Sequence, residues 1–363
     1  MLAALSTTLL LALAAPQSGD QIVFLDGTVL QVERVLTENY TEVTYKKSNQ
    51  EGKKPADQVQ EVRHSLTPRD LGDFKDALDA MDDSDYAKAV AAFNVVLADK
   101  DLQSEARYAW TRQHAVTNMM LCYAATGNMT QVAATADRLL LEVPDTFFYG
   151  RALLTKAQAL QDKGDAAGAA AAYQQLLNDV GAKGLPEIWS REAELGLAIS
   201  AKGGTPTEKQ RKLEGLAEKN KDQFPSVANR ARVEVGNAMV ESEQFKDAKA
   251  RFQGIVDGGL AARETMASAY SGLGDCAYNM GLREQDTKKA AALYEEAALH
   301  FLRTAATYPE AFRLVPRALC HAGMSMVRIQ KREDAIAIAN KLKRNYTSSE
   351  WKAKLFQDMN LAQ

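Results

Sequence analysis

The feature that most constrains this chain is a short motif that recurs at distant places in the sequence. An aromatic residue is followed after two residues by Ala, and after three more by a second aromatic residue. The three occurrences are Tyr86, Ala89 and Phe93, then Phe245, Ala248 and Phe252, then Tyr294, Ala297 and Phe301. Spacings of three and four residues place these side chains on one face of an α-helix. The recurrence therefore predicts a stack of similar helical units.

Small residues support the same prediction. The chain has 60 alanines among 363 residues, many of them in the stretch from Ala77 to Ala339. In stacked helix pairs, small side chains let the adjacent helix approach closely, and bulky side chains fill the space between units. We expect the first role for Ala157, Gly236, Gly274 and Gly323, and the second for Phe93, Tyr173, Phe252 and Phe301.

These residues resemble the tetratricopeptide repeat, whose pattern has Gly and an aromatic residue in the first helix, then A-x3-F in the second helix, then Pro. The resemblance implies a mainly α fold, an α-solenoid of about seven helix pairs over residues 69–346. The unit spacing exceeds the family's roughly 34 residues. A degenerate unit is expected from Trp189 to Pro225, and a C-terminal capping helix is expected within residues 347–363.

The region before the helices has a different pattern. Short strand-like runs occur at 21–25, 28–35, 41–46 and 59–63, with apolar and polar residues alternating along 41–46, and a polar turn is expected over 48–54. Asp26-Gly27 between the first two runs is a strong hairpin signal. Four or five short strands in residues 20–65 predict a small antiparallel barrel-like module. This module resembles short β modules that precede helical repeats in exported bacterial proteins, where its role would be structural or in docking.

The first 15 residues are almost entirely apolar and carry Ala12 and Ala14 ahead of Pro16, which is typical of a secretory signal peptide. No Lys or Arg precedes Arg34, so the segment could instead stay uncleaved. The run is too short to span a bilayer, and no Cys follows it to carry a lipid. We expect an exported protein, periplasmic or extracellular, with no integral membrane segment in the mature chain.

The net charge bears on the class of partner, and the cysteine spacing bears on disulfide bonds. The formal net charge is −3, which predicts no nucleic-acid surface. The three cysteines, Cys122, Cys276 and Cys320, show no CxxC spacing and lie in apolar helical stretches. Buried free thiols are expected, although spacing leaves a Cys276 to Cys320 disulfide open.

No sequence motif for catalysis or for a cofactor is present. The four histidines show neither HExxH nor any other local spacing of a zinc site. Gly272-Leu273-Gly274 lacks the third glycine of a dinucleotide fingerprint and lies within a predicted helix. We therefore predict no enzymatic activity, no cofactor and no metal.

The resemblance also implies which side chains line the concave groove of the repeats, because the family uses fixed positions of each first helix. Carried onto this sequence, they are Arg151, Gln158 and Asp162, then Arg230, Asn237 and Glu241, then Asp275 and Tyr278, then Arg317 and Arg328. Only Arg230 and Asn237 partly match the family's carboxylate clamp, which disfavours an adaptor for chaperone tails.

Two functions are consistent with these patterns. The first is a protein–protein interaction scaffold of the bacterial cell envelope that binds a protein or peptide segment in the repeat groove. The second is a structural spacer of an envelope complex, docked through the β module. The sequence does not identify the partner.

Overall fold

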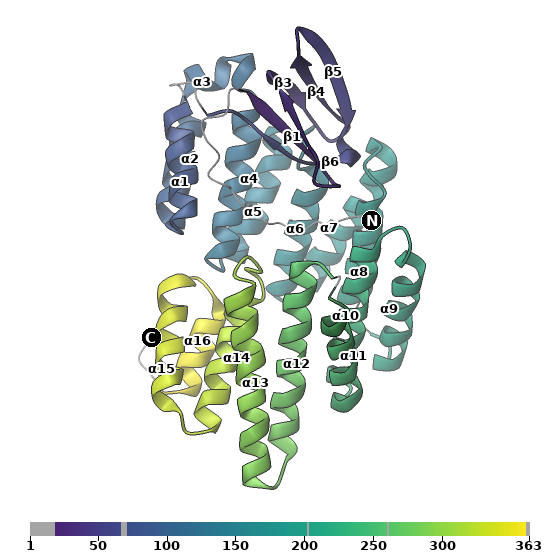
Figure 1. Ribbon diagram of the computed structural model, residues 1–363, viewed down its shortest axis with the longest axis vertical. Coiled ribbons are helices and arrows are strands. Elements are labelled where there is room, and N and C mark those ends of the chain that lie inside the picture. The colour runs from purple at the N-terminus through teal and green to yellow at the C-terminus, as the bar shows by residue number, and fades with distance from the viewer. Residues whose placement is uncertain (1–18, 67–70, 202, 260, 361–363) are drawn as a thin grey trace. The chain divides into compact units, whose positions relative to one another are not determined.

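The computed structural model describes residues 19–66, 71–201, 203–259 and 261–360 (Figure 1). The predicted signal peptide, residues 1–15, lies outside the described residues. The chain forms two compact units divided between Ser200 and Ala201, with the short segment Ala125–Asn128 grouped with the second unit. Among the residues described, no helix has both the length and the apolar character needed to cross a membrane.

The first unit begins with the predicted β module. Its strands are β1 (Asp20–Phe24), β2 (Val29–Val32), β3 (Arg34–Glu38), β4 (Glu42–Lys47), β5 (Gln50–Pro55) and β6 (Val59–Arg63). They form two three-stranded antiparallel sheets in the orders β2-β1-β6 and β3-β4-β5. Side chains from both sheets meet in one core of Ile22, Val32, Val35, Val43, Val59 and Val62.

The hairpin at Asp26-Gly27 is confirmed, and only Gly27 adopts positive φ there (84°). Two other expectations for this module were wrong. The run 28–35 is split between β2 and β3, because Val32 and Val35 both enter the core and strict alternation cannot bury residues three apart. Residues 50–55 form β5 and not a turn, because Ser48 and Asn49 alone turn the chain at positive φ.

The helices of the first unit follow the module in antiparallel succession. They are α1 (Gly72–Asp82), α2 (Tyr86–Ala98), α3 (Lys100–Ser104), α4 (Trp110–Ala125), α5 (Met129–Glu142), α6 (Tyr149–Asp162), α7 (Ala166–Lys183) and α8 (Ile188–Ser200). From α5 onward each helix packs against the next, and α6 also contacts α8.

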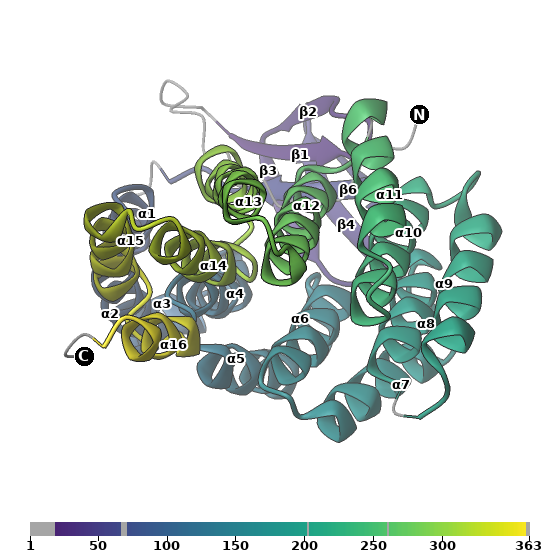
Figure 2. The ribbon, with the colours of Figure 1, turned by 90° about the horizontal axis from the view of Figure 1, so that it is seen from below.

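The second unit consists of helices alone. They are α9 (Pro206–Asn220), α10 (Pro225–Glu241), α11 (Phe245–Gly258), α12 (Arg263–Arg283), α13 (Thr287–Thr307), α14 (Val315–Arg328), α15 (Arg332–Asn345) and α16 (Glu350–Asp358). Viewed from below in Figure 2, α12, α13, α14 and α15 follow one another in chain order. Contacts between α10 and α12 and between α14 and α16 give the layered packing of a helical-repeat solenoid.

The predicted contacts between small and aromatic residues hold these layers together. The buried ring of Phe252 in α11 lies between Gly236 of α10 and Gly272 of α12. A Cβ atom added at either glycine would come within 2.6 Å or 2.4 Å of the ring. The same contact joins Gly274 to Phe301 and Gly196 to Tyr173. The aromatic residues of the sequence motif therefore serve as packing between helices, and the chain is mainly α, with tetratricopeptide-like helix packing in each unit and a β module at the start of the first unit.

The three cysteines are buried and free, as expected, and no disulfide joins Cys276 to Cys320. Burial raises the pKa of each of the three thiols to about 12.

Candidate partner-binding site

The predicted groove residues of the second unit lie on α10, α12 and α14. On α10, Asn237 donates a hydrogen bond to Glu234 (3.1 Å), and Glu241 is exposed and pairs with Lys209 (3.1 Å). Arg230 is half-buried on the same helix. These three side chains remain candidates for contact with a partner.

The structure brings two of the predicted residues together in an internal ion pair. Arg317 of α14 donates to both carboxylate oxygens of Asp275 on α12, at 2.8 and 2.9 Å, and to Ser271 Oγ at 3.1 Å. Asp275 is buried, which by itself would raise its pKa. Arg317 and His321 outweigh burial, so the pKa of Asp275 is lowered. This pair connects two first helices and leaves little of Asp275 for a partner.

Tyr278 and Arg328 form a second link between the same helices. Arg328 is exposed at the end of α14, and its hydrogen bond with Tyr278 raises the pKa of Arg328. Burial raises the pKa of Tyr278.

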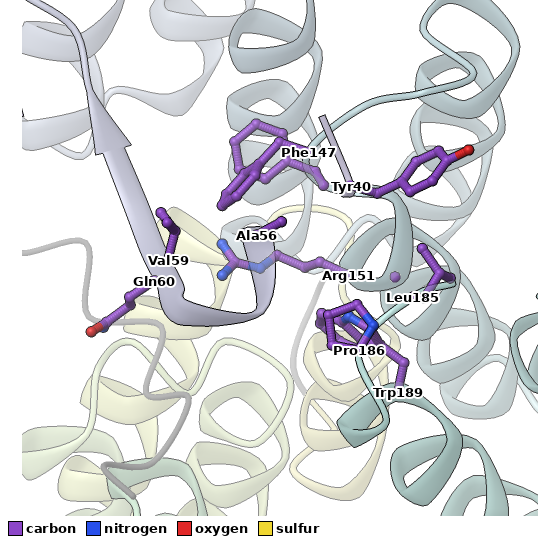
Figure 3. Close-up of a pocket in the computed structure, with 11 residues that line it drawn as sticks. Tyr40, Ala56, Val59, Gln60, Phe147, Arg151, Leu185, Pro186 and Trp189 are labelled. Atoms are coloured by element: carbon purple, nitrogen blue, oxygen red, sulfur yellow. The ribbon is translucent and has the colours of Figure 1, made fainter. Parts of the chain in front are cut away.

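The predicted residues of the first unit lie on α6 and have different surroundings. Asp162 is exposed and Gln158 is half-buried. Arg151, in the first turn of α6, faces the β module of its own chain and enters a pocket between the module and the helices (Figure 3).

This pocket has walls from three parts of the first unit. Tyr40, Ala56, Val59 and Gln60 come from the β module, Phe147, Phe148, Gly150 and Arg151 from the start of α6, and Leu185, Pro186 and Trp189 from the α7–α8 connection and α8. Figure 3 shows the Arg151 side chain extending from α6 toward Ala56 and Val59, with Trp189 and Pro186 on its other side. The walls are thus apolar and aromatic around one cation.

Two structural features position the side chains that surround Arg151. Backbone hydrogen bonding between Asn39 and Thr146 and from Tyr40 N–H to Asp145 O (3.2 Å) fixes the module against the α5–α6 connection. Gly150 leaves room for the Trp189 ring, since a Cβ atom at residue 150 would lie 2.5 Å from it.

Arg151 carries its charge into this pocket without a protein acceptor. No hydrogen bond or ion pair from its guanidinium to another described residue is present, and its recorded ring contact is with Phe148, 5.8 Å from the ring centroid. Burial lowers the pKa of Arg151, and the charge of Glu61 opposes this shift only in part. A half-buried guanidinium without an acceptor favours an incoming carboxylate, which can accept two parallel hydrogen bonds.

The size of the cavity, about 50 Å³, decides what can enter. Pockets for drug-sized molecules or organic cofactors are roughly 300–1,000 Å³. A cavity of this size holds a few waters or one carboxylate head group. The pocket therefore suits a single acidic side chain or a chain terminus.

A second polar cluster joins the β module to α4. Glu38, at the end of β3, accepts at Oε1 from Gln113 Nε2 (2.8 Å), and the same oxygen lies 2.6 Å from His114 Nε2. His64, directly after β6, lies on the other side of the carboxylate. The donor atoms of Glu38, His64 and His114 lie within 4.8 Å of one another, so these side chains could hold a metal ion.

The sequence prediction missed this cluster and half of the pocket for the same reason. Positions 38, 64 and 114 have no local spacing that marks a metal site, and Tyr40, Ala56 and Val59 have no motif that marks them as neighbours of Arg151. The only available signal was the presence of two histidines, His64 and His114, at the end of the predicted module and in the following helical region.

No protein-family model and no curated protein matches this chain. Solved structures with a similar fold include a tetratricopeptide repeat protein from Parabacteroides merdae, with 13% identity, a TM-score of 0.44 and coverage of 80% of this chain and 98% of that chain. Yeast Tom70 is 14% identical with a TM-score of 0.25, covering 82% and 74%. A signal transduction ATPase with a tetratricopeptide repeat sensor from Pyrococcus horikoshii is 12% identical with a TM-score of 0.35, covering 83% and 52%.

All three TM-scores are below 0.5. The tetratricopeptide-like character of this chain is seen in its own helix pairs and in the contacts between glycines and aromatic rings.

Proposed function

We propose that this protein is a non-enzymatic interaction scaffold of the bacterial cell envelope that binds a segment of a partner protein through a carboxylate. The observation that carries the proposal is that the half-buried Arg151 guanidinium lies among aromatic side chains and has no acceptor among the described residues. Helical-repeat solenoids generally serve as binding surfaces, which agrees with this role. The apolar run of residues 1–15 supports export.

Recognition would begin with an acidic side chain or a C-terminal carboxylate of the partner entering the pocket. Arg151 would hold it by paired charge-assisted hydrogen bonds, which are roughly twice as strong as neutral ones. Phe147 and Trp189 would exclude water and pack against apolar neighbours of the carboxylate.

A display library of short peptides with free C-termini tests this proposal. Peptides selected by the wild-type protein should be enriched in Asp, Glu or a required C-terminal carboxylate. Arg151→Gln removes the charge and should weaken binding of those peptides by roughly 10- to 100-fold, the effect of about 1.5–3 kcal/mol for a hydrogen bond to a charged group.

Arg34→Gln is the matched control, because Arg34 is exposed on β3 and away from the pocket residues. It should bind the selected peptides as the wild type does. Selection without any acidic preference, or equal affinity for the wild type and Arg151→Gln, would reject the pocket as the recognition site. Amidation of a C-terminal carboxylate distinguishes recognition of a terminus from recognition of a side chain.

The predicted groove residues of α10 offer a second contact of the same kind. Replacing Arg230 and Asn237 together with Ala should weaken capture of the partner and leave the melting temperature nearly unchanged, since both side chains are only half-buried. Unaltered capture would remove α10 from the binding surface and leave the Arg151 proposal standing.

A further inference from the structure

Two buried atoms in the cluster between the β module and α4 lack partners. Glu38 Oε2 and His64 Nε2 make no hydrogen bond, although they face each other at 3.5 Å. Their side chains are only 2% and 4% exposed, so bulk water does not solvate them. Buried polar atoms are nearly always satisfied, and a cation bound by both atoms would satisfy the carboxylate oxygen and the ring nitrogen together.

The second nitrogen of His64 is already oriented by another carboxylate. His64 Nδ1 lies 3.4 Å from Asp20 Oδ2. Asp20 is itself fixed by the backbone N–H groups of Val35 and Ser65, each donating at 2.7 Å. Trp110 stacks on the imidazole ring with a centroid distance of 3.9 Å and an interplanar angle of 5°. A carboxylate on one imidazole nitrogen commonly directs the other nitrogen toward a metal ion.

His114 supplies a third donor from α4. Its Nε2 lies 2.6 Å from Glu38 Oε1, and its ring is 5.2 Å from the His64 ring, with nearly perpendicular planes at 87°. Two imidazoles bound to one tetrahedral Zn²⁺ through nitrogens about 2.1 Å from the ion place their ring centroids roughly 5 Å apart. The observed arrangement has this separation.

We propose that Glu38, His64 and His114 bind one divalent transition-metal ion, with Asp20 as the residue that positions His64. Two imidazoles and one carboxylate form a donor set that Zn²⁺ prefers. Imidazole nitrogens bind a metal ion in their deprotonated form, so binding releases any proton that the ligating nitrogens carry. The His114 side chain is 14% exposed, so solvent reaches the α4 side of the cluster.

The ion would cross-link the β module to α4. Glu38 and His64 belong to the β module, whereas His114 belongs to α4, so one ion fastens the module to the helices. This role is separate from recognition at Arg151, because none of the three ligands lines that pocket.

The test uses untagged full-length protein that has been stripped with a chelator and titrated with Zn²⁺ against a chromophoric competitor. One equivalent should bind, the melting temperature should rise with Zn²⁺ concentration, and protons should be released. Co²⁺ in place of Zn²⁺ should give the visible absorption of a low-coordinate site with nitrogen and oxygen ligands.

Three variants separate ligand from positioning roles. His114→Gln should lower Zn²⁺ affinity by roughly 100-fold or more, because a ligand is lost. Asp20→Asn should lower it by about 10- to 100-fold, as expected for an outer-shell partner. His300→Gln, which changes a histidine of α13 outside the cluster, should bind like the wild type.

Absence of stoichiometric Zn²⁺ uptake by the wild type would overturn the proposal, as would equal affinity of His114→Gln. If a variant fails to fold, as judged by circular dichroism, X-ray absorption of the Zn²⁺-loaded wild type decides the question. A spectrum with imidazole scattering from two histidines supports the site, and a spectrum without imidazole rejects it.

Discussion

Arg151 and Arg317 are both half-buried arginines in the first turns of helices, but their surroundings give them different tasks. Arg317 shares two hydrogen bonds with Asp275 and one with Ser271, so its charge is used within the fold. Arg151 has aromatic walls and no acceptor. Removing one partner of a buried ion pair destabilises a protein by about 3–5 kcal/mol. Arg317 therefore contributes to stability, whereas Arg151 is the residue that we propose for binding.

The three thiols should be unreactive in the folded protein. Burial raises the pKa of Cys122, Cys276 and Cys320 to about 12, so almost no thiolate is present near neutral pH. A colorimetric thiol reagent should label none of the three in native protein and all three in denaturant. Fast labelling under native conditions would mean that the helices around that cysteine open readily.

Acid should destabilise the second unit in two steps. Burial lowers the pKa of His321, although Asp275 opposes this shift, so His321 stays neutral in the folded state while unfolded histidine takes up a proton. The free energy of unfolding should thus fall as the pH drops below about 6.5. The pKa of Asp275 is also lowered, so its contribution is present above the pKa of an unfolded Asp and is lost on further acidification.

Thermal unfolding between about pH 7.5 and about pH 5.5 measures the first step. His321→Gln should reduce the slope in that range. It should not abolish the slope, because burial also lowers the pKa of His300. An unchanged slope in His321→Gln would contradict the assignment of the first step. The nearby cations Arg317 and Lys354 also lower the pKa of His321, in the same direction as burial.

At the scale of elements, one aromatic ring sets the spacing of three helices. Phe252 of α11 is fully buried and contacts the glycine positions of α10 and α12. Gly236→Ala would push a methyl group to 2.6 Å from the ring, and overpacking of this kind destabilises by about 1–3 kcal/mol. A lower melting temperature is the expected result.

Gly254→Ala provides the matched control within α11. Gly254 is exposed, and an added Cβ atom would meet nothing within 4 Å. Alanine favours the helix there by about 0.5–1 kcal/mol, so this variant should raise the melting temperature. The contact with Phe252 would be shown to be loose if both variants moved the melting temperature in the same direction.

The sequence allowed the helical elements to be predicted better than the strands. Gly236 and Phe252 lie on helices that are adjacent in the sequence, so the spacing of the repeat motif predicts their contact. Residues 50–55 are mostly polar and have low β propensity, and they become a strand only because β4 supplies hydrogen bonds. The break between β2 and β3 at residue 33 likewise follows from the shape of the core, which the alternation of apolar and polar residues does not predict.

For the molecule as a whole, the helices pack mainly on their sequence neighbours. A destabilising substitution should therefore loosen only the helices near it. α10 contacts α9, α11 and α12. Gly236→Ala should therefore increase amide hydrogen exchange in α9–α12 and leave exchange in β1–β6 unchanged. Mass spectrometry of exchanged peptides makes the comparison, and faster exchange in the β module would contradict local coupling.

The candidate site is formed by residues far apart in the sequence, so local sequence patterns do not predict it. Arg151 was predicted from its repeat position, but the prediction placed it in an open groove. The pocket arises because Tyr40, Ala56 and Val59, about a hundred residues earlier in the chain, pack against α6. Contacts across that separation depend on tertiary docking, which neither periodicity nor motif spacing encodes.

The docking of the β module has a consequence for biosynthesis. The module is made before the helices, yet the groups that cover Glu38 and Tyr40 lie on α4 and α6, and the pocket is completed by Trp189. During translation, the strands are complete at Arg63, so they stay exposed until α4 and α6 have been made. Nascent chains that stall before α6 would expose this face of the module to other proteins.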